Sequence, residues 1–202
     1  MRWTRWIVVL TSLGALAAAA ILVSCATTGG GKTEMTPEQK IARGEGLSWS
    51  MGCNDCHTPG TFYGAPDTTR LLSGSELGWT GPWGTSYPRN LTPDPETGIP
   101  NWTEDQIVTA FRTGHRPDGS VLNPPMPWPA YSRTTDEDAH ALAAYIKSLR
   151  PIKHQAPAVV PPGQPVTGGH LVFPPPPAWD AMNLPPPPPG AAPGADTSGH
   201  AH

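Results

Sequence analysis

The sequence predicts a small all-α domain of about three main helices joined by long loops, followed by a proline-rich extended tail. Three segments combine helix-start signals with apolar residues at helical spacing. The connectors between them are rich in Gly, Pro and Asn and lack the alternating pattern of strands. The chain has 202 residues, of which 28 are proline and 22 glycine. This proline content is about one in seven against a usual one in twenty, so part of the chain lies outside a packed core.

Length and charge favour a one-domain protein and argue against a nucleic-acid-binding protein. An apolar fraction of 37% in 202 residues fits one domain with tails better than two domains. The formal net charge is −3. Proteins that bind nucleic acids show clustered Lys and Arg on a basic domain. The sequence has no such cluster, so we expect no nucleic-acid partner.

Residues 1–24 have the pattern of an export signal. Arg2 and Arg5 form a basic start, and an apolar run over residues 7–23 follows. The run is slightly short of the roughly 20 residues that span a bilayer and contains polar residues, which suits a cleaved signal better than a membrane helix. An uncleaved helix is the alternative, and both place the domain outside the cytoplasm.

Residues 22–25, Leu-Val-Ser-Cys, resemble the lipobox of bacterial lipoproteins. That resemblance implies cleavage before Cys25 and attachment of lipid to its sulfur. Two or three acyl chains hold a protein to a membrane almost permanently. We therefore expect residues 25–35 to be a flexible linker from a lipid-anchored Cys25, with the domain facing the periplasm or the cell exterior.

The expected domain covers residues 36–152, and its first helix begins at Thr36. Thr36 is a suitable N-cap, Pro37 suits the first helical position and Gln39 completes a capping box. Apolar or small residues then recur at helical spacing as far as Met51. This pattern predicts an amphipathic helix that ends near residue 51.

Two further helices are predicted by the same signals. One begins with the capping box of Thr103 and Gln106 and stops at Gly114. The other begins at Thr135, carries an acidic first turn and ends before Pro151. Both are amphipathic, so each is expected to bury one face.

The segment 153–202 is expected to be mostly an extended or disordered tail. Runs of proline lack backbone donors and adopt an extended left-handed helix. A few apolar residues in this tail, among them Leu171, Phe173 and Trp179, offer contacts by which it docks on the domain. A spacer or a proline-recognition ligand is the alternative.

Residues 53–57, Cys-Asn-Asp-Cys-His, form the C-x-x-C-H motif of c-type haem attachment. Each thiol can form a thioether with a haem vinyl group, and the imidazole of His57 reaches the iron. A disulfide redox pair would need a thioredoxin-like βαβ setting, and a zinc site would need a further pair of ligands. The motif therefore predicts one covalent haem c, held through Cys53, Cys56 and His57, with a structural disulfide between the two cysteines as the alternative.

A haem also accounts for the long connectors over residues 58–101 and 115–134. Loops of this length are unusual in a small domain unless they wrap something. The apolar face of a haem substitutes for core that short helices do not supply. We expect a fold organised by its cofactor.

Met126 is the predicted second axial ligand of the iron. It lies 69 residues after His57 in the stiff sequence Pro-Pro-Met-Pro-Trp-Pro. The flanking prolines fix the backbone and present the sulfur at little entropic cost. A thioether raises the reduction potential relative to a second imidazole. Alternatives are Met126 as a core gap-filler, and the other side chains able to bind iron, which are Met35, Met51, Met182, His115 and His140.

The chain then resembles the class I cytochrome c family, in particular the cytochrome c subunits of bacterial periplasmic dehydrogenases. The resemblance covers residues 36–152 and rests on the segments 90–99, 111–119 and 125–128, together with Trp102. It implies axial His57 and Met126 and a crossing of the first and last helices. Those subunits often carry two or three C-x-x-C-H motifs, whereas this chain has one.

The resemblance also implies roles around the haem. Asn90 or Trp102 is expected near a haem propionate. A backbone carbonyl soon after the motif, at Pro59 or Pro66, is expected to accept the Nδ1 proton of the axial imidazole.

These features predict an electron-transfer protein rather than an enzyme. A six-coordinate haem has no open position for substrate, and the expected role is single-electron transfer between a dehydrogenase, an oxidase or another cytochrome, alone or as a subunit of such a complex. Alternatives are a peroxidase-like haem enzyme, a gas or redox sensor in which Met126 is labile, and a structural envelope lipoprotein.

Overall fold

The computed structural model describes residues 34–174, and residues 36–174 belong to one structural unit. The predicted signal segment, Cys25, most of the linker and residues 175–202, with Met182, lie outside the described residues. Within residues 34–174, no helix is long and apolar enough to cross a membrane.

The three predicted helices are present, each with the expected N-cap. Helix α2 spans Pro37–Ser50, α4 spans Glu104–Thr113 and α6 spans Asp136–Ser148. Both predicted capping boxes form, at the start of α2 and at the start of α4. Helix α4 ends at Gly114, whose φ of 77° is a left-handed conformation that glycine adopts without strain.

Four shorter helical elements lie between the main helices. They are α3 (Cys53–His57), η1 (Thr61–Tyr63), η2 (Thr68–Arg70) and α5 (Trp128–Tyr131). Helix α3 follows α2 almost directly through Gly52, which has a φ of 73°. The C-x-x-C-H motif therefore has its own short helix.

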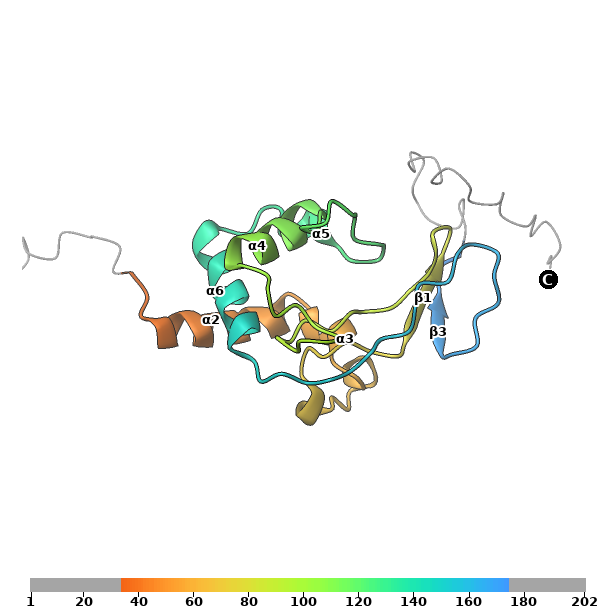
Figure 1. The fold of residues 1–202 in the computed structure, drawn as a ribbon, viewed down its shortest axis with the longest axis horizontal. Coiled ribbons are helices and arrows are strands. Elements are labelled where there is room, and N and C mark those ends of the chain that lie inside the picture. The colour runs from red at the N-terminus through yellow and green to blue at the C-terminus, as the bar shows by residue number, and fades with distance from the viewer. Residues whose placement is uncertain (1–33, 175–202) are drawn as a thin grey trace, which may run out of the picture. The chain divides into compact units, whose positions relative to one another are not determined.

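Helix α6 packs against both α2 and α4, and these contacts hold the apolar core (Figure 1). The crossing of α2 and α6 is closest at Gly44, where an added Cβ would lie 2.0 Å from the carbonyl oxygen of Ala141. Only glycine, which has no side chain, lets α2 and α6 approach this closely.

The buried core residues are Leu72, Ile107, Val108, Phe111, Ala139, Leu142, Ala143, Tyr145 and Ile146.

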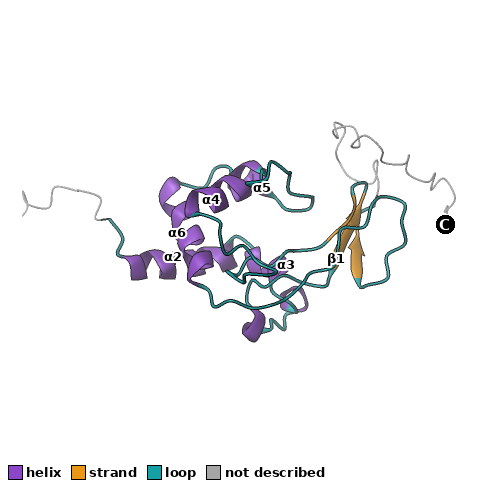
Figure 2. Ribbon diagram, in the orientation of Figure 1, coloured by secondary structure: helices purple, strands orange, loops and turns teal. Residues whose placement is uncertain are grey.

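A small three-stranded sheet lies away from the helices (Figure 2), so the expectation of an all-α domain is wrong. Strands β1 (Gly78–Gly81) and β2 (Gly84–Ser86) form an antiparallel hairpin. Strand β3 (His170–Val172) pairs in parallel with β1, with Trp79 opposite Leu171. The strand order is β2-β1-β3.

Residues 153–174, here named the strap, run back along the domain and supply β3. Val160 exchanges two main-chain hydrogen bonds with Thr85, at 2.8 and 2.9 Å, and the side chain of Phe173 contacts those of Trp79 and Trp83. Ala156 is only 3% exposed. The domain boundary expected at residue 152 thus does not separate the strap from the domain.

Candidate haem site

Buried hydrogen bonds fix helix α3, which carries both motif cysteines and His57. The amide of Asn54 donates to the hydroxyl of Ser48 at 3.0 Å and accepts from the hydroxyl of Thr58 at 2.7 Å. The Thr58 hydroxyl in turn accepts the main-chain N–H of Leu72 at 2.9 Å. Asn54 is fully buried whereas the neighbouring Asp55 is exposed. The two residues between the cysteines therefore play different parts, which the motif alone does not reveal.

The imidazole of His57 has one nitrogen committed to the protein. Its Nδ1 lies 2.7 Å from the carbonyl oxygen of Arg89. A carbonyl only accepts hydrogen bonds, so Nδ1 carries the proton and Nε2 keeps its lone pair. Burial lowers the pKa of His57, although the hydrogen bond to Arg89 acts in the opposite direction. A neutral ring with a free Nε2 is the form that binds a metal ion.

The acceptor of this proton differs from the one expected. The resemblance placed it at Pro59 or Pro66, and both positions are wrong, because the carbonyl belongs to Arg89. The carbonyl of Pro59 instead accepts the main-chain N–H of Asp67 at 2.8 Å. Arg89 follows the β1–β2 hairpin, so the acceptor lies 32 residues after His57 in the sequence.

The two motif thiols are free and partly buried. Burial raises the pKa of Cys53 to about 12 and that of Cys56 to about 11. Catalytic cysteines in disulfide exchange have lowered pKa values, because the thiolate is the reactive form. These thiols have the opposite property, which weighs against a redox-catalytic pair.

Met126 lies on the same apolar cluster as the motif. Its side chain packs against the core, as do those of Met51 and Cys53. Its loop is tied to β2 by a hydrogen bond from the hydroxyl of Ser86 to the carbonyl of Pro124. The fold thus brings the sulfur and the C-x-x-C-H helix to one cluster from distant parts of the chain.

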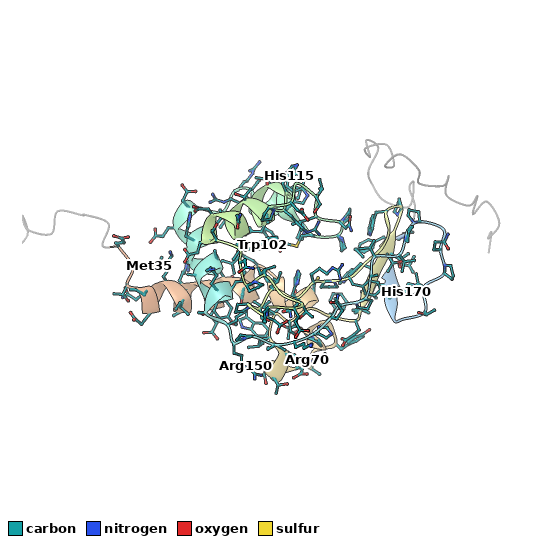
Figure 3. All side chains as sticks on the ribbon, viewed as in Figure 1. Met35, Arg70, Trp102, His115, Arg150 and His170 are labelled. Carbon is teal, nitrogen blue, oxygen red and sulfur yellow. The ribbon has the colours of Figure 1, made fainter. Side chains whose placement is uncertain are left out.

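The histidine alternatives for the second axial position are otherwise engaged. His115 is exposed, with Nδ1 3.0 Å from the carbonyl of Thr113, and Figure 3 shows it at the outer end of α4. Both ring nitrogens of His140 have partners, the carbonyl of Asp136 at 2.8 Å and the carboxylate of Asp105 at 3.0 Å. The ring of His140 therefore has no free nitrogen for a metal ion, and His115 is on the surface.

Asn90 does not fit the expected contact with a propionate. Its carbonyl oxygen accepts from the main-chain N–H and the hydroxyl of Thr92, at 2.9 and 2.8 Å. Its amide donates to the hydroxyl of Thr97 at 2.9 Å and to the carbonyl of Ile152 at 2.7 Å. A side-chain amide has two donor hydrogens and two lone pairs, so all its capacity is used. Asn90 is a structural residue that ties its loop to the chain after α6.

Trp102 lies among the helices (Figure 3), where it packs against the apolar core. Its carbonyl accepts a hydrogen bond of 2.7 Å from the ammonium group of Lys147. Trp102 is partly buried and, like Met126, packs against the core cluster.

The donor set fits a haem. Helix α3 carries two free thiols and an imidazole with a free Nε2, and Cys53 on this helix packs against the same apolar core as the thioether of Met126. Residues 41–150 match the family model described as cytochrome c. This chain belongs to the cytochrome c family. The cofactor of this cytochrome is therefore haem c.

Curated relatives of the cytochrome are named as subunits of dehydrogenases. It is 35% identical over 139 residues to the cytochrome c subunit of a quinone alcohol dehydrogenase from Gluconobacter oxydans, a match that covers 68% of this chain and 27% of the relative. It is 38% identical over 130 residues to the fructose dehydrogenase cytochrome subunit of Gluconobacter japonicus, covering 62% of this chain and 25% of the relative. The resemblance to dehydrogenase cytochrome subunits is confirmed.

Another relative is a diheme cytochrome c-type protein from Cereibacter sphaeroides, 34% identical over 116 residues that cover 55% of this chain and 37% of the relative. The cytochrome spans about a quarter of the length of the two dehydrogenase subunits named above. The match is thus to one part of longer proteins.

Proposed function

We propose that this chain is a membrane-anchored c-type cytochrome with one haem that carries single electrons between redox partners in the bacterial cell envelope. In this proposal Cys53 and Cys56 hold the haem covalently and His57 and Met126 are its axial ligands. When bound, the haem iron supplies one-electron chemistry between its ferric and ferrous states.

The observation that carries the proposal is the state of His57. The hydrogen bond of 2.7 Å to the carbonyl of Arg89 fixes the ring orientation and the tautomer and leaves Nε2 as the only free nitrogen. Ligating histidines commonly donate their other ring N–H to a carbonyl, which raises the basicity of the ligand. His57 follows both thiols on one short helix whose orientation is set by buried hydrogen bonds of Asn54.

The ligand pair supports electron transfer rather than chemistry on a bound substrate. His57 and Met126 would fill both axial positions, and neither needs to move when the charge of the iron changes. Helix α3 and the Pro-rich loop of Met126 are each tied to the domain by hydrogen bonds. The chain's contribution is then to hold ligands, exclude water and set the reduction potential.

The names of the relatives support a dehydrogenase as one redox partner. The lipobox-like sequence ending at Cys25 supports attachment to a membrane, where tethering raises the effective concentration of carrier and partner. Cys25 lies outside the described residues, so this part of the proposal rests on the sequence.

The test is the spectrum and mass of protein matured in a host that attaches haem c. We expect a pyridine haemochrome spectrum of c type with one haem per chain, an intact mass that includes one haem, and a low-spin ferric spectrum with the weak near-red band of methionine–iron ligation. A protein whose two motif thiols remain free after maturation contradicts the proposal. A high-spin ferric spectrum would instead favour a haem enzyme or sensor with a labile Met126.

A further inference from the structure

Arg89 connects the axial histidine to the strap. Its main-chain carbonyl accepts the Nδ1 proton of His57 at 2.7 Å. Its guanidinium Nη1 donates to the carbonyls of Ala156 and Pro157, at 3.2 and 3.4 Å. One residue thus holds the imidazole with its main chain and the strap with its side chain.

The strap end of this connection is itself fixed. Ala156 is 3% exposed, and Val160 pairs through its main chain with Thr85, four residues before Arg89. His154 is held by hydrogen bonds of 2.8 Å to the carbonyl of Ser73 and 3.0 Å to the carboxylate of Glu76. The acceptors of the guanidinium are therefore anchored at both ends.

The rest of the domain also holds the main chain around Arg89, since the neighbouring Asn90 is buried and fixed by four side-chain hydrogen bonds. Pro88 before it accepts a hydrogen bond of 3.2 Å from Ser75, and Leu91 after it donates one of 2.9 Å to Leu72. The side chain of Arg89 is exposed on its solvent side. Among the described residues, its guanidinium donates only to the two strap carbonyls. The Arg89 side chain therefore binds the main chain of the strap by hydrogen bonds and forms no ion pair with the described residues.

We propose that Arg89 is a positioning residue for the axial imidazole, and that the strap acts through it as a brace that keeps the Arg89 carbonyl in place. The proposal rests on the function proposed above, in which His57 binds the iron. The strap begins after residue 150, where the match to the family ends. The strap thus lies outside the residues that match the family model, whereas Arg89 lies inside them.

The brace acts on two measurable properties of His57. A fixed acceptor slows the exchange of the Nδ1 proton with water, because exchange requires the hydrogen bond to open. A strong hydrogen bond from Nδ1 also makes the ring a more basic ligand, which favours the ferric state and lowers the reduction potential. Loosening the brace therefore speeds exchange and raises the potential.

The test uses the holo-protein with Arg89→Met, which keeps an unbranched side chain and removes the donors. Arg89→Lys keeps the charge and a donor. Arg43→Met is the matched control, because the guanidinium of Arg43 bonds Asp138 at 2.8 Å on α2 and α6 and has no contact with His57. The readouts are exchange of the His57 Nδ1 proton, followed by NMR on the reduced protein, and the reduction potential.

We expect exchange about tenfold faster or more in Arg89→Met, together with a higher potential, and values near those of the wild type in Arg43→Met and Arg89→Lys. Loss of the positive charge of Arg89 alone would lower the reduction potential. The direction in which the potential of Arg89→Met changes therefore distinguishes a loosened His57 hydrogen bond from a purely electrostatic effect. An exchange rate in Arg89→Met equal to that of Arg43→Met overturns the inference.

A second pair of variants leaves Arg89 intact. Val160→Pro removes the N–H that donates to Thr85 at 2.9 Å, whereas the neighbouring Val159 has no such main-chain bond. We expect faster exchange in Val160→Pro than in Val159→Pro, and equal rates overturn the inference. A different variant tests the function proposed above. If His57→Ala leaves the low-spin spectrum of the holo-protein unchanged, His57 is not an axial ligand and that proposed function is contradicted.

Discussion

Met126 is a side chain whose role depends on a single atom, its sulfur. Replacement by Leu keeps a similar volume on the apolar cluster and removes the thioether. We expect Met126→Leu to lose the near-red ferric band and to lower the reduction potential by on the order of 0.1 V, a fraction of the roughly 0.8 V that axial ligands span. Spectroscopy and a redox titration measure both effects.

Met51→Leu is the matched control for this substitution. Met51 is also partly buried against the core and lies close to the motif. Its replacement should leave the band and the potential nearly unchanged. If the two variants behave alike, the sulfur of Met126 is not the ligand.

His140 gives the helix pair α4 and α6 a dependence on pH. The hydrogen bond to the carboxylate of Asp105, followed by that to the carbonyl of Asp136, raises the pKa of His140, while burial and the charge of Lys40 act against this rise. A raised pKa in the folded state means that the protonated ring stabilises the fold below the unfolded value of about 6.5. That contribution is lost as the pH rises through the folded-state pKa.

We therefore expect His140→Gln to be less stable than the wild type at about pH 5.5 and nearly equal to it at about pH 8.5. Denaturant midpoints at the two values measure the difference. Because the pair is solvent-exposed, the effect should be small. A difference of the same size at both pH values would show that the ring acts through packing alone.

At the scale of elements, the crossing of α2 and α6 depends on Gly44. A Cβ there would meet the main chain of Ala141 at 2.0 Å and the Cβ of Tyr145 at 2.7 Å. At Gly46 on the same helix, a Cβ would have no neighbouring atom within 4 Å. We expect Gly44→Ala to cost about 1–3 kcal/mol of unfolding free energy, since backbone must shift to make room.

Gly46→Ala should stabilise the protein by up to about 1 kcal/mol, because alanine favours a helix. Guanidinium denaturation of the pair checks both signs. A stabilised Gly44→Ala variant would mean that the helices do not cross this closely.

The contact between hairpin and strap depends on Gly84 in the same way. Its φ is +92°, and a Cβ would lie 2.2 Å from the carbonyl oxygen of Val160. Gly119 has a φ of +81° with open space around it, so a side chain there meets similar backbone strain without the contact. We expect Gly84→Ala to speed tryptic cleavage after Lys153 more than Gly119→Ala does. Equal cleavage rates would show that the strap tolerates a displaced hairpin.

The helices could be predicted from the sequence because their signals are local. Thr36 with Gln39, and Thr103 with Gln106, specify helix starts within four residues. The strands could not be predicted, because β1 reads Gly-Trp-Thr-Gly and β2 reads Gly-Thr-Ser. These strands are stabilised by pairing with distant residues, of which β3 lies about ninety residues away.

The same division holds within the haem site. The C-x-x-C-H motif occupies five consecutive residues, so the sequence alone predicts the cofactor, haem c, and names Cys53, Cys56 and His57 as the residues proposed to hold it. The acceptor at Arg89 could not, because main-chain carbonyls carry no sequence signal. The resemblance implies Asn90 or Trp102 near a haem propionate, but the four hydrogen bonds of Asn90 within the protein depend on how two loops meet.

For the whole molecule, the main question is how the domain is attached. We expect Cys25→Ser to move the cytochrome from the membrane fraction to the soluble fraction of the envelope, since the substitution removes the sulfur that would carry lipid. Cell fractionation and intact mass measure the result, and the haem spectrum serves as a control for folding. Retention in the membrane with unchanged mass would favour an uncleaved helix as the anchor.

The strap also protects one edge of the sheet. Gly78 donates to the carbonyl of Gly169, and Phe173 donates to that of Thr80, both along β1. A fragment cut at residue 150 would expose these groups of β1 as an open edge, a template for pairing with a second chain. Soluble expression of the monomer therefore calls for a fragment that extends through residue 174, well beyond the limit that family matching suggests.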